Sequence, residues 1–396
     1  MNDEIRKRID ETTAEFLAIK KHLHEHPEES GKEVHTSKFL KAFVCDLGLD
    51  IVEAEGTGFV AVLDMSVPGK TLVIRSDIDG LPIQEDEENL KFKKTAVSKQ
   101  EGISHLCGHD AHMTIALWTM KLLAERKDQL RGRVLFAFEE GEENGTGILP
   151  MLKVLESLEP IDGVWGMHVA SFVDSGYFSL SEGPVMSGVF PFDISVQGKG
   201  GHCSRPDLAK NPLFAAASII NALGSAWANR MDPAHPVSLG LTTIHGGSSW
   251  NAIPDEVKIG GSLRFFDPDS GVVATKILEE VADYAARAQN CTATFLQSEI
   301  YSPLVNDSEL VRSIRDSISG DLGGKLLSGH TWYASEPFSR YGEKYPAAFG
   351  FLGTRNVEEG FGAEAHHGKF DVDDRALSLG VWVNYLIAKG FLNNAG

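Results

Sequence analysis

Hydrophobic residues near the start of the chain recur at helical spacing. Ile5, Ile9 and Phe16 stand among charged residues, and apolar positions spaced in this way line one face of an α-helix. We therefore predict an amphipathic helix over residues 2–22. Pro27 prevents it from continuing further, because proline lacks the backbone N–H that a helix interior requires.

Continuous apolar runs of strand length follow, within residues 71–76, 133–138 and 164–167. Such runs are typical of buried strands in an open α/β sheet, where sites are built at the carboxyl ends of the strands. A polar residue or pair follows each run: Asp77 and Asp79, Glu139 and Glu140, and His168. Asp77 and Asp79 alternate with apolar residues, so both can face the same side of the sheet.

The pattern changes near residue 183. Strands and helices are expected from there in the order β-α-β-β-α-β, the arrangement of a split ferredoxin-like unit. The six segments are 190–197, 211–230, 237–245, 257–266, 274–288 and 292–296. We predict an α/β protein whose mixed-sheet catalytic domain, residues 1–183 and 302–396, is interrupted by an inserted α+β lid domain, residues 184–301.

Composition narrows the class of protein. At 396 residues the chain exceeds the usual size of a single hydrophobic core, which agrees with two domains. Its formal net charge of -19 argues against nucleic acid as a partner, because phosphate binding needs basic patches. No apolar run approaches the ~20 residues of a membrane span. The four cysteines are widely scattered, which favours reduced thiols and a cytoplasmic location.

The segment from His105 to His112 has the residue types of a metal-binding loop. Cys107 and His109 lie two apart with Gly108 between them, so a thiolate and an imidazole can converge on one cation. A helical run begins just after them, and the N-terminus of a helix also favours a thiolate. Taken alone, the stretch also fits a free cysteine beside surface histidines. His105 and His112 are assigned no metal.

Further metal-binding residue types stand at the ends of other predicted elements. Glu139 and Glu140 follow one strand, His168 follows another, and His366 lies near the C-terminus. Thiolate, carboxylate and imidazole together suit zinc, manganese or a similar transition metal. In a pair of neighbouring carboxylates, one can bind metal while the other takes a proton from water. The four segments together predict a metallohydrolase.

In their order along the chain these motifs resemble those of M20-type metallopeptidases, in particular the amidohydrolase branch with aminoacylases, hippurate hydrolases and auxin-conjugate hydrolases. The resemblance runs nearly from end to end. It implies two divalent cations (Zn, Mn, Co or Ni), with Glu139 as the general base and Asp77 and Asp79 as residues that orient the ligands or tune the metal. The implied metal ligands are Cys107, His109, Glu140, His168 and His366.

The inserted domain carries three further residues that the resemblance implicates. His202 lies in a glycine-rich loop, and in the family the matching histidine reaches across a dimer to polarise the scissile carbonyl. Asn251 and Arg264 match positions that hold the carboxylate of the substrate, and an arginine suits a planar carboxylate. For Arg264 alone, a surface charge on a strand is the alternative.

Two segments depart from the family pattern. The family often has glycines where Glu142 and Glu143 stand, and we expect these two acids to be solvated charges of a turn. Pro337 replaces an acid and removes a backbone donor in Ser335-Glu-Pro-Phe338, which puts the shape of that loop and the choice of substrate in doubt.

The sequence therefore predicts a metal-dependent hydrolase of N-acyl amino acids or similar small amides, acting as a homodimer or dimer-based oligomer. Glu139 is expected to take a proton from a metal-activated water and to pass it to the leaving nitrogen. A dipeptidase or an N-acetyl-diaminopimelate deacetylase would use the same centre. Outside enzymes, the alternative is a metal-stabilised binding protein. The acyl group and the amino acid are not determined by the sequence.

Overall fold

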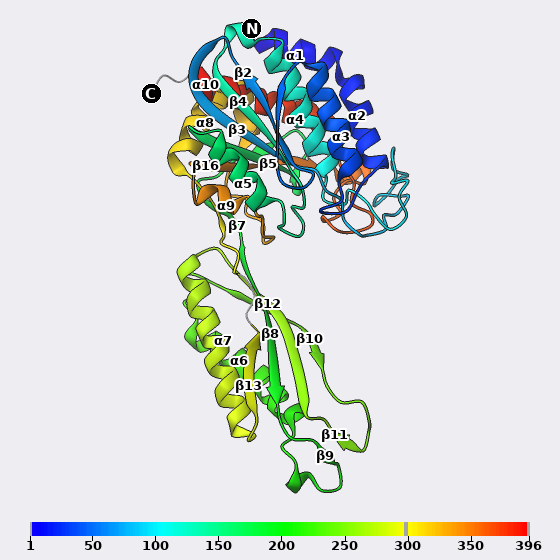
Figure 1. Cartoon of the computed structure of the whole chain (residues 1–396), viewed down its shortest axis with the longest axis vertical. Helices are drawn as coiled ribbons and strands as arrows, with labels where there is room; N and C mark the ends of the chain where they lie inside the picture. The colour runs from blue at the N-terminus through cyan, green and yellow to red at the C-terminus, as the bar shows by residue number, and fades with distance from the viewer. Residues whose placement is uncertain (1, 297–299, 394–396) are drawn as a thin grey trace. The chain divides into compact units, whose positions relative to one another are not determined.

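The computed structural model describes residues 2–296 and 300–393, and the chain divides into two compact units (Figure 1). The first unit consists of Met1–Gly183, Val305–His330 and Arg340–Gly396, and the second of Pro184–Leu304 and Thr331–Ser339. No helix in the described part of the chain combines the length and the apolar character that a membrane span needs.

Residues 331–339 lie in the second unit, whereas the sequence analysis placed them in the catalytic part. They belong to the second unit because their backbone pairs with its first strands. The N–H of Trp332 donates to the carbonyl of Val185 at 2.8 Å, and the N–H of Ser187 donates to the carbonyl of Ala334 at 3.0 Å.

The first unit is built on an eight-stranded mixed sheet with the order β1-β2-β4-β3-β5-β16-β6-β15. Strands β4, β3, β5 and β16 are mutually parallel and form its centre. The outer strands β2 and β6 run antiparallel to β4 and β16. The strands are β1 (Asp50–Glu53), β2 (Phe59–Asp64), β3 (Val67–Asp77), β4 (Arg131–Glu139), β5 (Gly163–Asp174), β6 (Phe178–Ser179), β15 (Leu326–Leu327) and β16 (Ala347–Arg355).

Helices α4 and α10 pack against each other and against the central strands of this sheet. Both helices bury mainly apolar side chains, although the start of α4 also buries His109, Asp110, His112 and Thr114. The apolar packing explains why the central strands carry continuous apolar runs. The helices of this unit are α1 (Asn2–Glu11), α2 (Thr13–Glu25), α3 (Val34–Asp46), α4 (His109–Ala124), α5 (Ile148–Ser157), α8 (Ser308–Leu322) and α10 (Arg375–Asn393). Short 3-10 turns occur at Lys127–Gln129, Gly323–Lys325 and Val357–Glu359.

The helix predicted over residues 2–22 is two helices, α1 and α2, separated at Thr12. The Thr12 hydroxyl donates to the carbonyl of Arg8 at 2.7 Å and accepts from Nε1 of Trp118 at 2.9 Å. Such a bond from a threonine to the preceding turn bends a helix. Ile5 and Ile9 are buried on α1, as the helical spacing predicted.

The second unit contains a four-stranded antiparallel sheet with the order β10-β12-β8-β13, against which α6 and α7 pack. The element order β8-α6-β10-β12-α7-β13 is the β-α-β-β-α-β order read from the sequence. Its elements are β8 (Gly188–Gln197), β9 (Gly201–His202), a 3-10 turn (Pro206–Leu208), α6 (Pro212–Arg230), β10 (Ser238–His245), β11 (Ala252–Ile253), β12 (Glu256–Phe265), α7 (Pro268–Ala288) and β13 (Thr292–Leu296).

Three of the four points in the sequence where the chain passes from one unit to the other lie within short elements: β7 (Gly183–Met186), β14 (Leu304–Asn306) and α9 (Ser339–Gly342). Helix α7 begins at Pro268, earlier than the expected residue 274. The cause is an N-cap, because the carboxylate of Asp267 accepts from the N–H of Ser270 at 2.8 Å, and Pro268 suits the first helical position.

Candidate metal centre

The carboxyl ends of the central parallel strands bring the predicted site residues to one edge of the sheet. Asp77, the last residue of β3, stands beside Glu139, the last residue of β4. Arg75 stands beside Gly166 of β5, so His168 lies level with Asp77. His168 lies within β5 rather than after it, because the strand continues to Asp174.

The loop before α4 brings Cys107 to this edge. Sγ of Cys107 lies 3.4 Å from Nε2 of His168. Gly108 has φ +85°, and a Cβ atom there would lie 2.4 Å from a methyl group of Val169. Only glycine fits this left-handed and tightly packed position, which explains the Cys-Gly-His order. Helix α4 then begins at His109.

Asp79 orients His109. Nδ1 of the imidazole lies 3.0 Å from both Oδ1 and the backbone carbonyl of Asp79, so Nδ1 carries the proton and Nε2 the lone pair. Nε2 of His109 is buried and has no hydrogen-bond partner among the described residues. A buried donor atom with a free lone pair fits a metal ligand.

A tight turn after β4 presents Glu142 and Glu143 to this imidazole. Gly141 has φ +56°, and the N–H of Glu143 donates to Oδ2 of Asp79 at 3.1 Å. Oε2 of Glu142 and Oε1 of Glu143 lie 3.9 and 3.8 Å from Nε2 of His109. The two acids therefore belong to the cluster.

His366 approaches Glu143 from the C-terminal part of the chain. Its Nε2 lies 3.2 Å from Oε1 of Glu143, and its N–H donates to the carbonyl of Leu106 at 2.9 Å. The residue has φ +67°, a conformation that costs a non-glycine residue on the order of 1 kcal/mol or more. Such strain is found mainly at functional sites.

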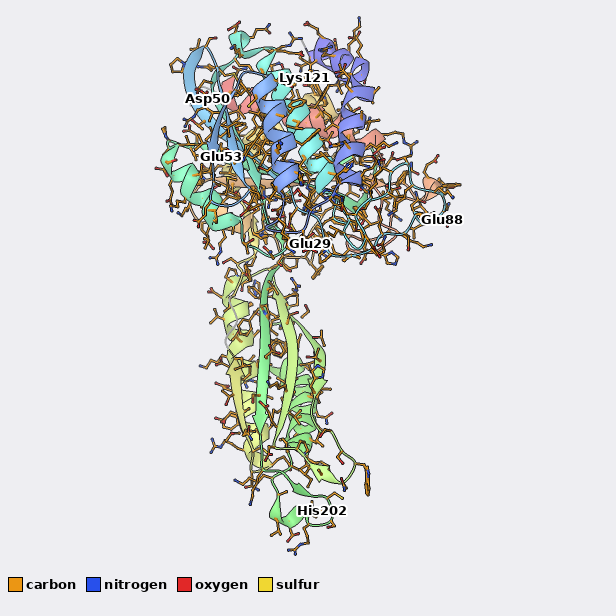
Figure 2. The ribbon with its side chains drawn as sticks, turned by 45° about the vertical axis from the view of Figure 1, so that its right-hand side comes forward. Glu29, Asp50, Glu53, Glu88, Lys121 and His202 are labelled. Atoms are coloured by element: carbon orange, nitrogen blue, oxygen red, sulfur yellow. The ribbon has the colours of Figure 1, made fainter. Side chains whose placement is uncertain are left out.

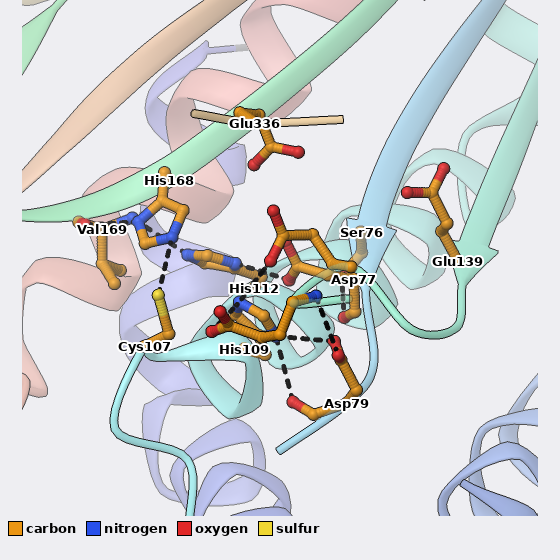
Figure 3. A network of polar contacts seen from close by, with 12 residues as sticks. Ser76, Asp77, Asp79, Cys107, His109, His112, Glu139, His168, Val169 and Glu336 are labelled. Carbon is orange, nitrogen blue, oxygen red and sulfur yellow. Dashed lines mark hydrogen bonds and ion pairs between the residues drawn. The ribbon is translucent and has the colours of Figure 1, made fainter. Parts of the chain in front are cut away.

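These residues form overlapping groups whose ligand atoms lie within 4.8 Å of one another. Cys107, His109 and His168 make one group, and Cys107, Glu143 and His366 make another. Figure 3 shows Cys107, His109 and His168 converging from a loop, a helix start and a strand. The two groups share a thiol and contain imidazoles and a carboxylate. These are the ligand types that suit two neighbouring transition-metal cations.

The charges of the cluster also fit cations. Burial, together with the carboxylates of Glu143, Glu142 and Asp77, raises the pKa of the Cys107 thiol well above its usual value. The effect of burial and of these carboxylates on the thiol is larger than the effect of the helix N-terminus, which was expected to favour the thiolate. A thiolate in these surroundings therefore requires a cation beside it.

The two ligand histidines have opposite electrostatic surroundings. Burial alone would lower the pKa of His109, but Asp77 and Asp79 raise it to about 10. Burial and the neighbouring His112 lower the pKa of His168 well below its usual value. Nδ1 of His168 lies 2.6 Å from the carbonyl of Val169, which leaves its Nε2 lone pair directed at Cys107.

Comparison with known proteins identifies the family of the chain. The sequence profile of the Peptidase family M20/M25/M40 matches residues 73–388. The chain belongs to this family. The match confirms the resemblance and the α/β fold class predicted from the sequence, and with them a metal-dependent amide hydrolase.

Three similar M20 proteins illustrate the range of the family. A thermostable carboxypeptidase of Saccharolobus solfataricus is 35% identical over 96% of this chain and 95% of its own length. An N-acetylcysteine deacetylase of Bacillus subtilis is 32% identical over 92% of this chain and 93% of its own. The crystal structure of a dinuclear metal-binding M20 peptidase from Bacillus subtilis has a TM-score of 0.83 and 29% identity, covering 98% of this chain and 100% of that one.

Glu139 and Glu140, predicted as base and ligand of the M20 centre, are not in the cluster. Oε1 of Glu139 accepts from Nη2 of Arg75 at 2.7 Å, and Oε2 accepts from the hydroxyl of Tyr341. Figure 3 shows Glu139 apart from the ligands, at the end of β4. Glu140 accepts from the N–H and the hydroxyl of Thr57. We therefore replace this pair by Glu142 and Glu143.

The reason for the correction is the turn. The sequence analysis took the last strand residues to face the site, but the positive φ of Gly141 redirects the chain so that the next two acids do so. Glu142 and Glu143 are buried or half-buried, and the expectation of solvated charges was wrong for them. The sequence did contain one indication that Glu139 has another role. Arg75 lies within an apolar run of strand length, and a buried arginine requires a buried carboxylate as its partner.

His112, to which the sequence analysis assigned no metal, lies beside the cluster and forms a further group with Asp77 and His109. Its Nδ1 lies 2.7 Å from Oδ1 of Asp77, and its Nε2 accepts from the N–H of Val169 at 2.9 Å. Both ring nitrogens are therefore used within the protein. Asp77 also accepts from Nη1 of Arg75 at 2.7 Å, so it joins His112 to the arginine at the edge of the sheet.

His202 and Asn251 share one end of the second unit. His202 on β9 pairs with Ala252 on β11, and the carbonyl of Asn251 accepts from the N–H of Cys203 at 3.0 Å. Figure 2 shows His202 on this loop, beyond the end of the four-stranded sheet. The ring is exposed, and its Nδ1 accepts from the N–H of Ser204 at 3.2 Å.

Arg264 lies near the opposite end of the same sheet. It pairs with Val189 on β8, whereas Glu256 at the other end of β12 pairs with Gln197, the last residue of β8 before the His202 loop. At about 3.3 Å per residue, the eight steps between Glu256 and Arg264 span roughly 26 Å. Nη1 of Arg264 is buried without a hydrogen-bond partner in the described chain. One copy of this unit cannot bring Arg264 and His202 to the same small substrate.

Proposed function

We propose that this protein hydrolyses the amide bond of N-acyl amino acids. One observation supports the proposal most strongly: two adjacent carboxylates, Glu142 and Glu143, lie 3.9 and 3.8 Å from Nε2 of His109, a buried nitrogen without a hydrogen-bond partner among the described residues. A binding or purely structural metal site needs a ligand there but not a second carboxylate. A hydrolase needs both, one for the cation and one for the proton of the water.

Each residue of the centre then has a role. Cys107, His109, Glu143, His168 and His366 would hold two divalent cations. When bound, these cations supply a water of lowered pKa and a Lewis acid for the carbonyl oxygen. Glu142 takes the proton of that water and delivers it to the leaving nitrogen. Asp79 accepts from Nδ1 of His109 and so leaves Nε2 as the ring nitrogen that would bind a cation.

Residues of the second unit complete the site in pairs of chains. His202 polarises the carbonyl oxygen of the substrate, and its carboxylate is bound by Asn251 from the same copy as His202 and by Arg264 from the other copy. The separation of His202 from Arg264 along the sheet supports a homodimer in which the two come from different copies. The buried Nη1 of Arg264 without a partner supports an anionic ligand there.

The names of two relatives support two kinds of substrate for this protein. The Bacillus relative named N-acetylcysteine deacetylase supports a small N-acyl amino acid, and the Saccharolobus relative named carboxypeptidase supports a short peptide with a free carboxylate. Both substrates carry a carboxylate beside the scissile amide. The deacetylase class agrees better with the predicted amidohydrolase branch.

A substrate panel tests the proposal. Metal-reconstituted protein is assayed with N-acetyl, N-benzoyl and dipeptide forms of the same amino acids, with chelated protein as control. We expect metal-dependent release of the free amino acid from the N-acyl forms, at a higher kcat/KM than from the dipeptides. Turnover of dipeptides alone would make the protein a peptidase, and no turnover of any amide would contradict the proposed function.

A further inference from the structure

Glu33 lies outside the metal cluster, at the start of α3, and is fully buried. Its Oε1 accepts two backbone N–H groups, from Gly31 at 2.8 Å and from Gly141 at 2.9 Å. The second bond links the N-terminal part of the chain to the turn after β4, because Gly141 directly precedes Glu142. A buried carboxyl group that accepts from a distant backbone amide fixes the position of that amide.

The other oxygen of Glu33 faces Thr57. Oγ1 of Thr57 lies 2.9 Å from Oε2 of Glu33 and 2.5 Å from Oε2 of Glu140. A hydroxyl group has one proton, so it can donate to only one of these carboxyls, and the other contact needs a carboxyl proton. Burial raises the pKa of Glu33. The Thr57 hydroxyl therefore links Glu33 to Glu140, with one proton more than the hydroxyl itself supplies shared within this chain of contacts.

The turn that carries the two functional acids is held from both sides. Glu33 holds the N–H of Gly141, and Asp79 holds the N–H of Glu143 at 3.1 Å. Glu142 stands between these two anchors. The turn itself has little freedom, because a Cβ atom on Gly141 would lie 2.3 Å from Oγ1 of Thr146.

We propose that Glu33 is a positioning residue of the centre, which acts through the Gly141 amide to hold Glu142 against the water and Glu143 against the cation. The inference rests on the proposed function for the roles of these two acids. Asp79 fixes the same turn but also orients His109, so Glu33 is the anchor that can be changed without touching a ligand.

The test compares three substitutions of Glu33. Glu33→Gln keeps an oxygen for the two N–H groups and offers an N–H to Thr57, so kcat and metal affinity stay close to wild type. Glu33→Leu removes both contacts. We expect kcat to fall by about 10²-fold with little change in KM, because a displacement of about 1 Å costs that much. The dissociation constant of the metal rises about tenfold or more, as on loss of other residues that orient ligands.

Glu28→Leu is the matched control. Oε2 of Glu28 accepts from the N–H of Thr36 at 2.8 Å on the same helix start, but the structure gives Glu28 no contact with the turn. We expect loss of this contact to lower the melting temperature, while kcat of the folded protein stays at the wild-type level. Equal kcat losses in the Glu28 and Glu33 leucine variants would reduce Glu33 to a structural role and overturn the proposal.

A third variant decides the matter if Glu33→Leu does not fold. Glu33→Asp keeps the carboxyl group but is one methylene too short to reach Gly141, so we expect it to lose kcat and metal affinity while Glu33→Gln keeps both. Glu33→Asp at wild-type level, or Glu33→Gln reduced as far as Glu33→Asp, would overturn the proposal. Wild-type protein that hydrolyses no amide would refute the proposed function alone, since metal affinity still reports on the anchor.

Discussion

Nη2 of Arg75 lies 2.7 Å from Oε1 of Glu139, and both side chains are buried at the edge of the central sheet. The same guanidinium donates a hydrogen bond from Nη1 to Oδ2 of Asp77 at 2.7 Å. Glu139 therefore balances the charge of a buried arginine that also holds Asp77. This contact separates the first acidic pair after β4 from the second, which faces the metal ligands.

Glu139→Gln is expected to act mainly on stability. The amide oxygen still accepts from Arg75, but the buried guanidinium loses a compensating charge, which costs on the order of 2–3 kcal/mol of unfolding free energy. We expect kcat of the folded variant to fall less than tenfold. Denaturant unfolding and steady-state kinetics on the same preparation check both. A large loss of kcat at unchanged stability would return Glu139 to the site.

Much of the fold could be predicted because it depends on local periodicity. The apolar runs that became β3, β4 and β5 are buried strands, and Gly108 marks the sharp bend before α4. The helix over residues 2–22 was only partly right. At Thr12 the hydroxyl bonds to the carbonyl of Arg8 and so bends the helix, and the same hydroxyl accepts from Trp118, more than a hundred residues away. No local pattern contains the contact with Trp118.

Residues of the site could be predicted where their chemical type alone identifies them. They could not be predicted where the direction of the backbone determines which side chain faces the site. Cys107, His109, His168 and His366 lie in one cluster, and the sequence singled them out because thiol and imidazole groups are few and stood at the ends of predicted elements. The acids were misplaced because Glu139-Glu-Gly-Glu-Glu143 contains two equivalent pairs. The choice between them depends on the φ angle of Gly141 and on the partner of Arg75, and both are tertiary facts.

Cys107→Ser is expected to weaken metal binding. Serine has a harder and far less acidic donor, and Cys107 belongs to both overlapping groups of ligands, so the loss affects both cations. Elemental analysis after dialysis is predicted to give less metal per chain, with kcat reduced in proportion. Cys291→Ser, at a buried cysteine of the second unit, is the control. Full metal content in Cys107→Ser would remove Cys107 from the ligands.

His24 makes stability depend on pH. It is buried with Nδ1 2.9 Å from Oδ2 of Asp110 and Nε2 3.2 Å from Oε2 of Glu85. Burial alone would lower the pKa of His24, but Asp110 and Glu85 raise it from 6.5 to about 9. The folded state therefore binds this proton more tightly than the unfolded state, and the stabilisation is full below pH 6.5 and is lost as the pH rises to about 9.

The variant His24→Gln tests this dependence. Denaturant unfolding of chelated protein gives the free energy of each variant, so that metal release does not contribute. We expect the advantage of wild type over His24→Gln to shrink by up to about 3 kcal/mol between pH 6.5 and 9. His35→Gln, at an exposed histidine, is the control. An advantage that is constant or grows with pH would contradict the protonated His24.

Mixing two inactive variants tests the shared site. His202→Ala lacks the polarising imidazole, and Glu142→Gln lacks the base, yet a mixed dimer contains one site with both groups intact. After subunit exchange at equal amounts we expect roughly a quarter of the wild-type rate, since half of the dimers are mixed and one of their two sites is complete. Demonstrated exchange without recovery would place His202 within its own chain or outside catalysis.

The most direct test of the account is the comparison of metal content and kcat in Glu142→Gln and Glu143→Gln. Glutamine in place of Glu142 leaves the ligands intact and removes the base. We predict full metal content and a kcat lower by about 10²–10⁴-fold that added cation does not restore. Glu143→Gln loses metal and regains part of its rate at high cation concentration. A Glu142→Gln protein that keeps its rate, or that regains it with added metal, would contradict the assignment of Glu142 as the proton acceptor.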